Sequence, residues 1–174
     1  MKNEMVLVYL LLGSNEGDLI INIDTAVRYI GQKLQISRIS SIYDTAPECN
    51  LAQPRFLNAV IEAYTDLPPF LLLEFVKNIE VKMGRISAPR YSQRIIDIDI
   101  LFYEKMIINT QDLVIPHPRV QERAFVLVPL AEIAPDFIHP IIGETIAHIL
   151  SYLKYDNHAV TKKISHNQRE VKNV

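Results

Sequence analysis

Residues 94–102 constrain the fold of this chain more than any other segment, because isoleucine and aspartate alternate along them. Alternate side chains of an extended strand share a face. The pattern therefore predicts one strand with an apolar face and an acidic face. The apolar face carries Ile96, Ile98, Ile100 and Phe102, and the acidic face carries Asp97 and Asp99. The two carboxylates start from main-chain positions about 6.5–7 Å apart.

Two explanations of the acidic pair remain open at this point. Neighbouring carboxylates repel each other unless a cation or a proton joins them, and a hard divalent ion is a suitable partner. Alternatively, alternation of Ile and Asp is typical of a half-exposed edge strand, although Asp is a poor strand former. Arg94 projects from the side of Ile96, so it reaches the aspartates only if the chain twists or bends there.

Size and composition restrict the class of protein. The chain has 174 residues, of which 49% are hydrophobic and 22% charged, which predicts a globular protein with one domain. A net charge of −2 gives no general attraction to nucleic acid or to an anionic membrane. The single cysteine, Cys49, cannot form an internal disulfide, and the apolar run at residues 5–12 is too short to span a bilayer. We expect a cytoplasmic monomer.

The order of elements predicts the fold class. Continuous or alternating apolar runs indicate strands at residues 6–12, 36–43, 56–65 and 95–102, with 104–108 pairing back as a short hairpin. One helix begins after Asp18, and a second follows Pro68 and Pro69 and ends near Gly84. The resulting β-α-β-β-α-β order predicts an α+β, ferredoxin-like fold, in which an antiparallel sheet carries two helices on one face.

The rest of the chain supplies loops, a cover and a tail. Residues 44–55 and 85–93 lack periodicity and are predicted to be loops, of a length that is often functional. Residues 116–153 are expected to cover the other face of the sheet in short pieces separated by prolines, with a helix at 145–153. We expect one domain over residues 1–155 and a polar C-terminal tail over 156–174.

Further segments suggest ligand binding. His117 lies between two prolines, and Arg119 and Arg123 are one helical turn apart, an arrangement that suits polyphosphate oxygens. Phe56, Asn58 and Phe125 provide rings and a carboxamide that could hold a flat heterocycle. Each of these residues could instead serve packing or solvation. The segment 13–18 lacks the Gly-Lys-Ser/Thr ending of a phosphate-binding loop and is better explained as a tight turn.

Several separated motifs resemble the 6-hydroxymethyl-7,8-dihydropterin pyrophosphokinase family. They are Gly13-Ser14-Asn15, Tyr43-Asp44-Thr45-Ala46-Pro47, Gln53-Pro54-Arg55-Phe56-Leu57-Asn58-Ala59, Ile79-Glu80 with Gly84-Arg85, Arg94-Ile95-Ile96-Asp97-Ile98-Asp99-Ile100-Leu101, Pro116-His117-Pro118-Arg119 and Arg123-Ala124-Phe125. The resemblance runs from about residue 6 to residue 145. It implies a ferredoxin-like fold and transfer of pyrophosphate from ATP to the hydroxymethyl group of a dihydropterin, with AMP as the second product, in folate biosynthesis.

The resemblance also implies roles for individual residues. It places two Mg²⁺ ions on Asp97 and Asp99, and catalysis on this pair with Arg94 and Arg123. The residues it places against ATP are Lys77, Glu80, Arg85, Arg94, Ile100, His117, Arg119 and Arg123. The residues it places against the pterin are Thr45, Ala46, Glu48, Phe56, Asn58 and Phe125. It implies small-molecule substrates, no nucleic acid and no membrane, and some relatives are fused to another folate-pathway enzyme.

Three positions depart from the family pattern. Ala46 replaces a frequent proline, Ser92-Gln93 replaces a glycine and a small residue or proline, and Ser87 replaces an arginine. These changes concern the two loops and their closure on substrates. Two other functions remain open: a non-catalytic module that binds RNA or a small ligand, and a metal-dependent phosphohydrolase that uses Asp97, Asp99 and His117.

Overall fold

A computed structural model of the chain describes residues 4–47, 54–85, 92–155 and 160–164. Its strands are β1 (Val6–Ser14), β2 (Gln35–Ile39), β3 (Ile42–Thr45), β4 (Phe56–Thr65), β5 (Asp97–Tyr103), β6 (Ile108–Asn109), β7 (Val114–Ile115) and β8 (Val160–Ile164). Its helices are α1 (Leu19–Gly31), α2 (Pro69–Lys82), the 3₁₀ turn η1 (Val120–Glu122), α3 (Ala124–Ile133) and α4 (Ile146–Tyr152).

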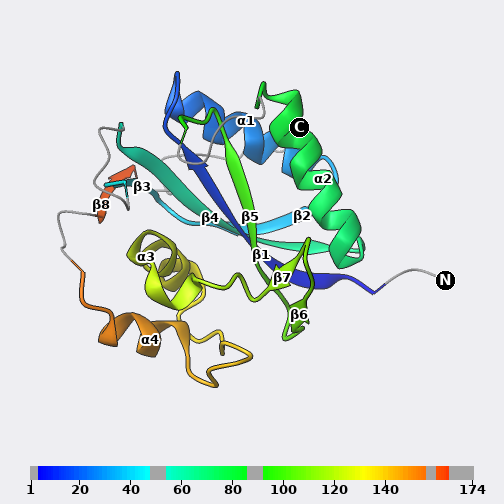
Figure 1. The fold of residues 1–174 in the computed structure, drawn as a ribbon, viewed down its shortest axis with the longest axis vertical. Coiled ribbons are helices and arrows are strands. Elements are labelled where there is room, and N and C mark those ends of the chain that lie inside the picture. Colours follow the sequence, from blue (N-terminus) through cyan, green and yellow to red (C-terminus); the bar gives the residue numbers. More distant parts are fainter. Residues whose placement is uncertain (1–3, 48–53, 86–91, 156–159, 165–174) are drawn as a thin grey trace.

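The main sheet is antiparallel, with the strand order β5-β1-β4-β3-β8 and with β2 also paired to β4. Helices α1 and α2 cover one face, and α3 and α4 lie on the other (Figure 1). Each face has its own apolar core: Leu10, Ile61 and Ile98 belong to the first, and Leu11, Val60 and Leu127 belong to the second. The predicted ferredoxin-like α+β fold is confirmed, with the C-terminal part covering the second face.

Local signals fix the ends of the helices as the sequence predicts. The carboxylate of Asp18 accepts a hydrogen bond from the main-chain N–H of Ile21 and caps α1. Helix α2 begins with Pro69, and Gly84 follows its C-cap with φ 98°, a conformation that a residue without Cβ adopts readily. Thr145 caps α4 by accepting from the N–H of His148.

A β-bulge changes the predicted orientation of Phe102. The register between β1 and β5 shifts between Tyr9 and Leu10, which leaves Leu101 as an extra residue on β5. Because one extra residue inverts the alternation beyond it, Phe102 lies in the second core with Leu101 instead of sharing a face with Ile98 and Ile100. The prediction for Phe102 is wrong, whereas Asp97 and Asp99 precede the bulge and keep the predicted orientation.

The predicted strand 36–43 is two strands, β2 and β3, which both pair with β4. Ser40 causes the interruption, since its hydroxyl accepts from the N–H of Val60 at 2.9 Å and donates to the carbonyl of Ser41 at 2.8 Å. A side chain thus takes a place that a main-chain group would have in a regular ladder. The strand β3 also extends to Thr45, so the first two residues of the predicted loop 44–55 belong to the sheet.

Three further expectations differ from the structure. Residues 104–108 do not pair back on β5, because the chain turns at Glu104 (φ 47°) and β6 pairs with β7. Helix α3 continues through Pro129, whose missing N–H removes one hydrogen bond while packing in the second core holds the helix. Within the segment expected to be a tail, residues 160–164 form β8 and extend the sheet beside β3.

His139 gives the turn before α4 a dependence on pH. Its Nδ1 accepts hydrogen bonds from the N–H groups of Ile141 and Ile142, and its ring lies edge-on to Phe102. Burial lowers the pKa of His139 below its ordinary value of 6.5. The folded protein therefore keeps this ring neutral at a pH where the unfolded chain has already bound a proton.

We expect the free energy of unfolding to fall as the pH is lowered through and below 6.5, because the unfolded state then binds more protons at His139. In His139→Gln, the amide oxygen can still accept from the turn but does not titrate. Urea unfolding at pH 7.5 and at pH 5.5 should show a smaller loss of stability in this variant than in the wild type. Equal losses in both proteins would contradict the assignment, since the other histidines are common to the two chains.

Candidate active site

The acidic pair lies where β1 ends and β4 and β5 begin, on the sheet face that α3 covers. Gly13 pairs directly with Asn58 on β4 and with Asp97 on β5, and Leu11 pairs with Val60 and Asp99. Directly paired residues of antiparallel strands point to the same face. Because Leu11 and Val60 belong to the second core, Asp97, Asp99 and Asn58 share the face of that core.

Gly13 keeps the floor between the acidic pair and Asn58 free of side chain. A Cβ added at Gly13 would lie 2.9 Å from the Oδ1 atom of Asn58, closer than a carbon and an oxygen can approach without movement. The amide of Asn58 is held from its other side, because its Nδ2 donates to the hydroxyl of Thr45 at 2.6 Å. The central strand therefore places a bare main-chain surface between the two polar groups.

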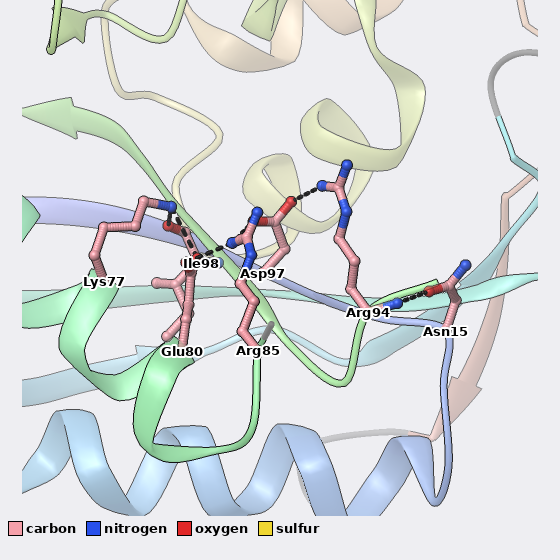
Figure 2. A network of polar contacts seen from close by, with 7 residues as sticks. All are labelled: Asn15, Lys77, Glu80, Arg85, Arg94, Asp97 and Ile98. Carbon is pink, nitrogen blue, oxygen red and sulfur yellow. Dashed lines mark hydrogen bonds and ion pairs between the residues drawn. The ribbon is translucent and has the colours of Figure 1, made fainter. Parts of the chain in front are cut away.

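Two arginines hold Asp97 (Figure 2). Arg85, which follows α2, donates to Oδ1 at 2.6 Å, and Arg94, which precedes β5, contacts Oδ2. The chain bends at Ile95, and this bend brings Arg94 to the acidic face, as the sequence required. Burial acts to raise the pKa of Asp97, but the charges of Arg85 and Arg94 outweigh it and hold the pKa below its ordinary value.

Asp99 has a different environment. Burial raises the pKa of Asp99, and the charge of Asp97 raises it further. The pair thus combines an ionised carboxylate held by two arginines with a second carboxylate whose charged form is disfavoured by burial and by its neighbour, and a hard divalent ion would relieve the repulsion between them. No group of three or more His, Cys, Asp or Glu suited to a metal occurs among the described residues, so phosphate oxygens or water would have to complete a shell around Asp97 and Asp99. Magnesium is commonly held in this way, by one or two carboxylates and substrate phosphates.

Lys77 and Glu80 occupy the outer edge of β5 (Figure 2). Glu80 Oε1 accepts from the N–H of Ile98 at 2.7 Å, and Lys77 Nζ donates to the carbonyl of Ile98 at 3.2 Å and to Glu80 at 2.8 Å. The other oxygen of Glu80 contacts Arg85. Burial raises the pKa of Glu80, against the opposing charge of Lys77. The two side chains complete an edge that would otherwise offer unpaired main-chain groups.

Of the other residues expected to contact the nucleotide, some lie near the acidic pair and others do not. His117 lies beside β5, because its N–H donates to the carbonyl of Leu101 at 3.0 Å. Arg123 precedes α3 and is among the cations whose charge acts on Asp99. Arg119 directly precedes η1 and pairs with Glu122 at 3.3 Å, with half of its side chain exposed. The side chain of Ile100 packs in the first core, on the opposite face of the sheet from Asp97 and Asp99.

The expected heterocycle residues come from three elements. Phe56 and Asn58 begin β4, Thr45 ends β3, and Phe125 begins α3, where the guanidinium of Arg123 lies 5.4 Å from its ring centroid. Ala46 follows β3 and is partly buried. Glu48 lies outside the described residues. The assignment of all these residues to substrates stays a prediction.

The sequence analysis quoted Gly13 and Asn15 in a family motif but gave neither residue a role in the site. Gly13 and Asn15 belong to a segment that we explained as a tight turn, yet Gly13 lies between Asn58 and Asp97, and Asn15 binds the main chain of Arg94. A glycine at the end of a buried strand was a signal for close approach of another group. Nothing in the sequence indicated that Asn15 pairs with a residue 79 positions later.

Comparison with known proteins places the chain in a family. Residues 9–135 match the model of the family described as 7,8-dihydro-6-hydroxymethylpterin-pyrophosphokinase (HPPK). The chain is 43% identical over 151 residues to a 2-amino-4-hydroxy-6-hydroxymethyldihydropteridine pyrophosphokinase of Methylorubrum extorquens, covering 86% of this chain and 94% of the relative. It is 45% identical over 139 residues to a folic acid synthesis protein of Dictyostelium discoideum, of which it spans 21%.

The fold agrees with that of a solved structure whose name includes HPPK. A crystal structure of Plasmodium falciparum HPPK-DHPS superposes with a TM-score of 0.73 and 19% identity, covering 86% of this chain and 45% of the other. The likeness shows the fold alone, and the sequence match shows the family. This chain belongs to the 7,8-dihydro-6-hydroxymethylpterin-pyrophosphokinase family.

Proposed function

We propose that this protein transfers pyrophosphate from ATP to 6-hydroxymethyl-7,8-dihydropterin in folate biosynthesis. The observation that carries the proposal is the juxtaposition of Asp97 and Asp99 with Asn58 across the bare surface at Gly13. On this proposal, a polyphosphate site and a heterocycle site adjoin on one sheet face. Membership of the HPPK family supports the same reaction.

Asp97 and Asp99 are proposed to hold two Mg²⁺ ions, which would neutralise the triphosphate charge and orient it. Arg85, Arg94 and Arg123 supply positive charge from three separate elements around the pair. Guanidinium groups suit phosphate oxygens, because they present several N–H donors in one plane. His117, held by the carbonyl of Leu101, is proposed to donate to the same phosphates.

Asn58 and Thr45 are proposed to bind the polar edge of the pterin, since a carboxamide and a hydroxyl offer both donors and acceptors. Phe56 and Phe125 are proposed to stack against its faces. In the reaction, the hydroxymethyl oxygen forms a bond to the β-phosphorus while the bond from that phosphorus to the α,β-bridging oxygen breaks. AMP leaves and the hydroxyl proton is released. The residues position these groups and no covalent intermediate is needed.

Partners and location follow from the same proposal. The substrates are ATP and the hydroxymethyl dihydropterin, and we propose a cytoplasmic monomer with its domain over residues 1–155. One relative, from Arabidopsis thaliana, is named a folate synthesis bifunctional protein, and the chain spans 25% of it. Among the described residues, no helix has the length and apolar character that a membrane span requires.

The test is an assay for AMP from ATP, with and without the hydroxymethyl dihydropterin and with and without Mg²⁺. We expect one AMP and one pterin diphosphate per ATP, and none when either the pterin or Mg²⁺ is omitted. Release of inorganic phosphate without a pterin requirement would support a phosphohydrolase instead. Binding of ATP with no AMP formation would support a non-catalytic module.

We expect Gly13→Ala to weaken pterin binding about tenfold. The new methyl group would lie 2.9 Å from the Oδ1 atom of Asn58, so the Asn58 amide must move away from the position proposed to bind the pterin. Gly31→Ala is a matched control, since a Cβ there meets Ile36 at an ordinary 3.6 Å within a helix. Calorimetric titration with the pterin measures both variants. An unchanged dissociation constant in Gly13→Ala would show that the space above this residue is not used by the ligand.

A further inference from the structure

Asn15 is buried beside the site and has one hydrogen-bonding group that the fold does not use. The residue is 3% exposed, and within the described parts of the chain its Nδ2 atom has no hydrogen-bond partner. Buried polar groups in folded proteins are almost always paired, because leaving an amide N–H unpaired away from water is costly. An unused buried donor next to a binding site therefore suggests a partner that the ligand supplies.

The orientation of this amide follows from its neighbour. The oxygen of Asn15 accepts from the main-chain N–H of Arg94 at 2.7 Å, and the N–H of Asn15 donates to the carbonyl of Arg94 at 3.0 Å. Since the N–H of Arg94 can only donate, the atom that faces it must be Oδ1, and the other end of the amide must be the donor. Asn15 thus fixes the main chain of Arg94 with one end and leaves Nδ2 unused.

The direction of Nδ2 distinguishes the two substrate sites. Figure 2 shows the amide nitrogen turned away from the pair formed by Arg94 and Asp97. On β1, Gly13 has Asp97 on its β5 side and Asn58 on its β4 side. Asn15 lies two residues after Gly13, which pairs with Asn58, and on this ground we assign its unused donor to the side of the heterocycle.

The turn that carries Asn15 is fixed by other contacts. Asn22 on α1 donates through Nδ2 to the hydroxyl of Ser14 at 3.1 Å and to the carbonyl of Glu16 at 2.7 Å. Both residues that flank Asn15 are thereby held without any use of its amide nitrogen. The turn around this donor is consequently fixed before a ligand binds, and because the nitrogen itself is buried, a ligand reaches it only when a neighbouring group moves aside.

We propose that Asn15 Nδ2 donates a hydrogen bond to an oxygen of the bound pterin, while Oδ1 fixes Arg94 on the phosphate side. Asn15 is then a ligand-binding residue that joins the two halves of the site. This inference rests on the proposed function, because it takes the ligand beside Asn58 to be the pterin.

The test compares Asn15→Asp, Asn15→Ala and Asn22→Ala by calorimetry, with the hydroxymethyl dihydropterin titrated in the presence of Mg²⁺ and a non-hydrolysable ATP analogue. Asn15→Asp keeps an acceptor for the N–H of Arg94 but has no donor, so we expect pterin binding to weaken about tenfold. Asn22→Ala removes the contacts that hold the turn but keeps the Asn15 amide, so it should lower the melting temperature and weaken pterin binding less than Asn15→Asp does.

Asn15→Ala is the second variant, to be used if the buried carboxylate of Asn15→Asp prevents folding. This variant loses both the Nδ2 donor and the contact that fixes Arg94. Because Arg94 is assigned to the phosphates, a separate titration with the ATP analogue measures the effect of losing the Arg94 contact. Weakening of pterin binding that exceeds weakening of nucleotide binding by about fivefold supports the proposal. Equal weakening of both ligands, or wild-type pterin affinity in Asn15→Asp, overturns it. If the wild type itself does not bind the pterin, the proposed function fails instead.

Discussion

Replacing Asp99 by Asn should make the protein inactive and more stable at the same time. The change removes a carboxylate whose pKa is raised by burial and by Asp97, so the folded state loses a repulsion. We expect a gain of about 1 kcal/mol, or about 2–4 °C in melting temperature. We also expect kcat for AMP formation to fall at least about 1,000-fold, because the group that would hold the metal loses its charge.

Asp97→Asn should lower kcat by a similar factor but change stability in the opposite direction. Its carboxylate has a lowered pKa because Arg85 and Arg94 lie beside it, and the neutral amide leaves both guanidinium groups without that charge. Asp112→Asn, at an exposed position far along the chain, serves as the control and should leave both kcat and melting temperature unchanged. Near-normal turnover in either variant of the pair would disprove the assignment of metal-binding residues.

Replacing Glu80 by Ala should give the largest loss of stability. Glu80 is 2% exposed, and its carboxylate binds the N–H of Ile98, the ammonium of Lys77 and the guanidinium of Arg85. Its removal leaves the buried N–H of Ile98 unpaired, takes the acidic partner from Lys77 and leaves Arg85 with Asp97 alone. We expect a cost of about 3 kcal/mol, or about 6–12 °C in melting temperature.

Glu74→Ala on the same helix is the matched control, because Glu74 is exposed, and it should change stability by less than about 0.5 kcal/mol. The family resemblance implies that ATP also contacts Glu80. If it does, the nucleotide should stabilise Glu80→Ala less than it stabilises the wild type, whereas loss of a purely structural residue would leave the two gains equal. Urea unfolding with and without the ATP analogue measures this. A melting temperature of Glu80→Ala within 2 °C of that of Glu74→Ala would mean that the network in Figure 2 contributes little.

The sequence predicted the acidic pair, the first two helices and the full extent of β4, because each depends on local patterns of period two or 3.6 and on capping residues. It did not predict the side of Phe102, since a bulge at Leu101 arises from the pairing of β1 with β5. Likewise, the break between β2 and β3 depends on the contact of Ser40 with Val60 across the sheet. Such features depend on strand register, which a single sequence does not display.

In the site, too, local features were predictable from the sequence and features that depend on distant contacts were not. The residues that carry charge or aromatic rings were recognisable by type, and the structure brings Asp97, Arg85 and Arg94 together. Gly13 and Asn15 were missed because their roles consist of a missing side chain and of a hydrogen bond to a distant main chain. The strand β8 was missed because three of its five residues are polar and because it pairs only at the edge of the sheet, beside β3.

The central claim is that Asp97 and Asp99 together hold the metal that joins this protein to ATP. A crystal structure with Mg²⁺, a non-hydrolysable ATP analogue and the pterin tests it most directly. We predict metal density within about 2.0–2.1 Å of carboxylate oxygens of both residues, shared with triphosphate oxygens. A triphosphate bound with its metal in contact with neither carboxylate would contradict the account.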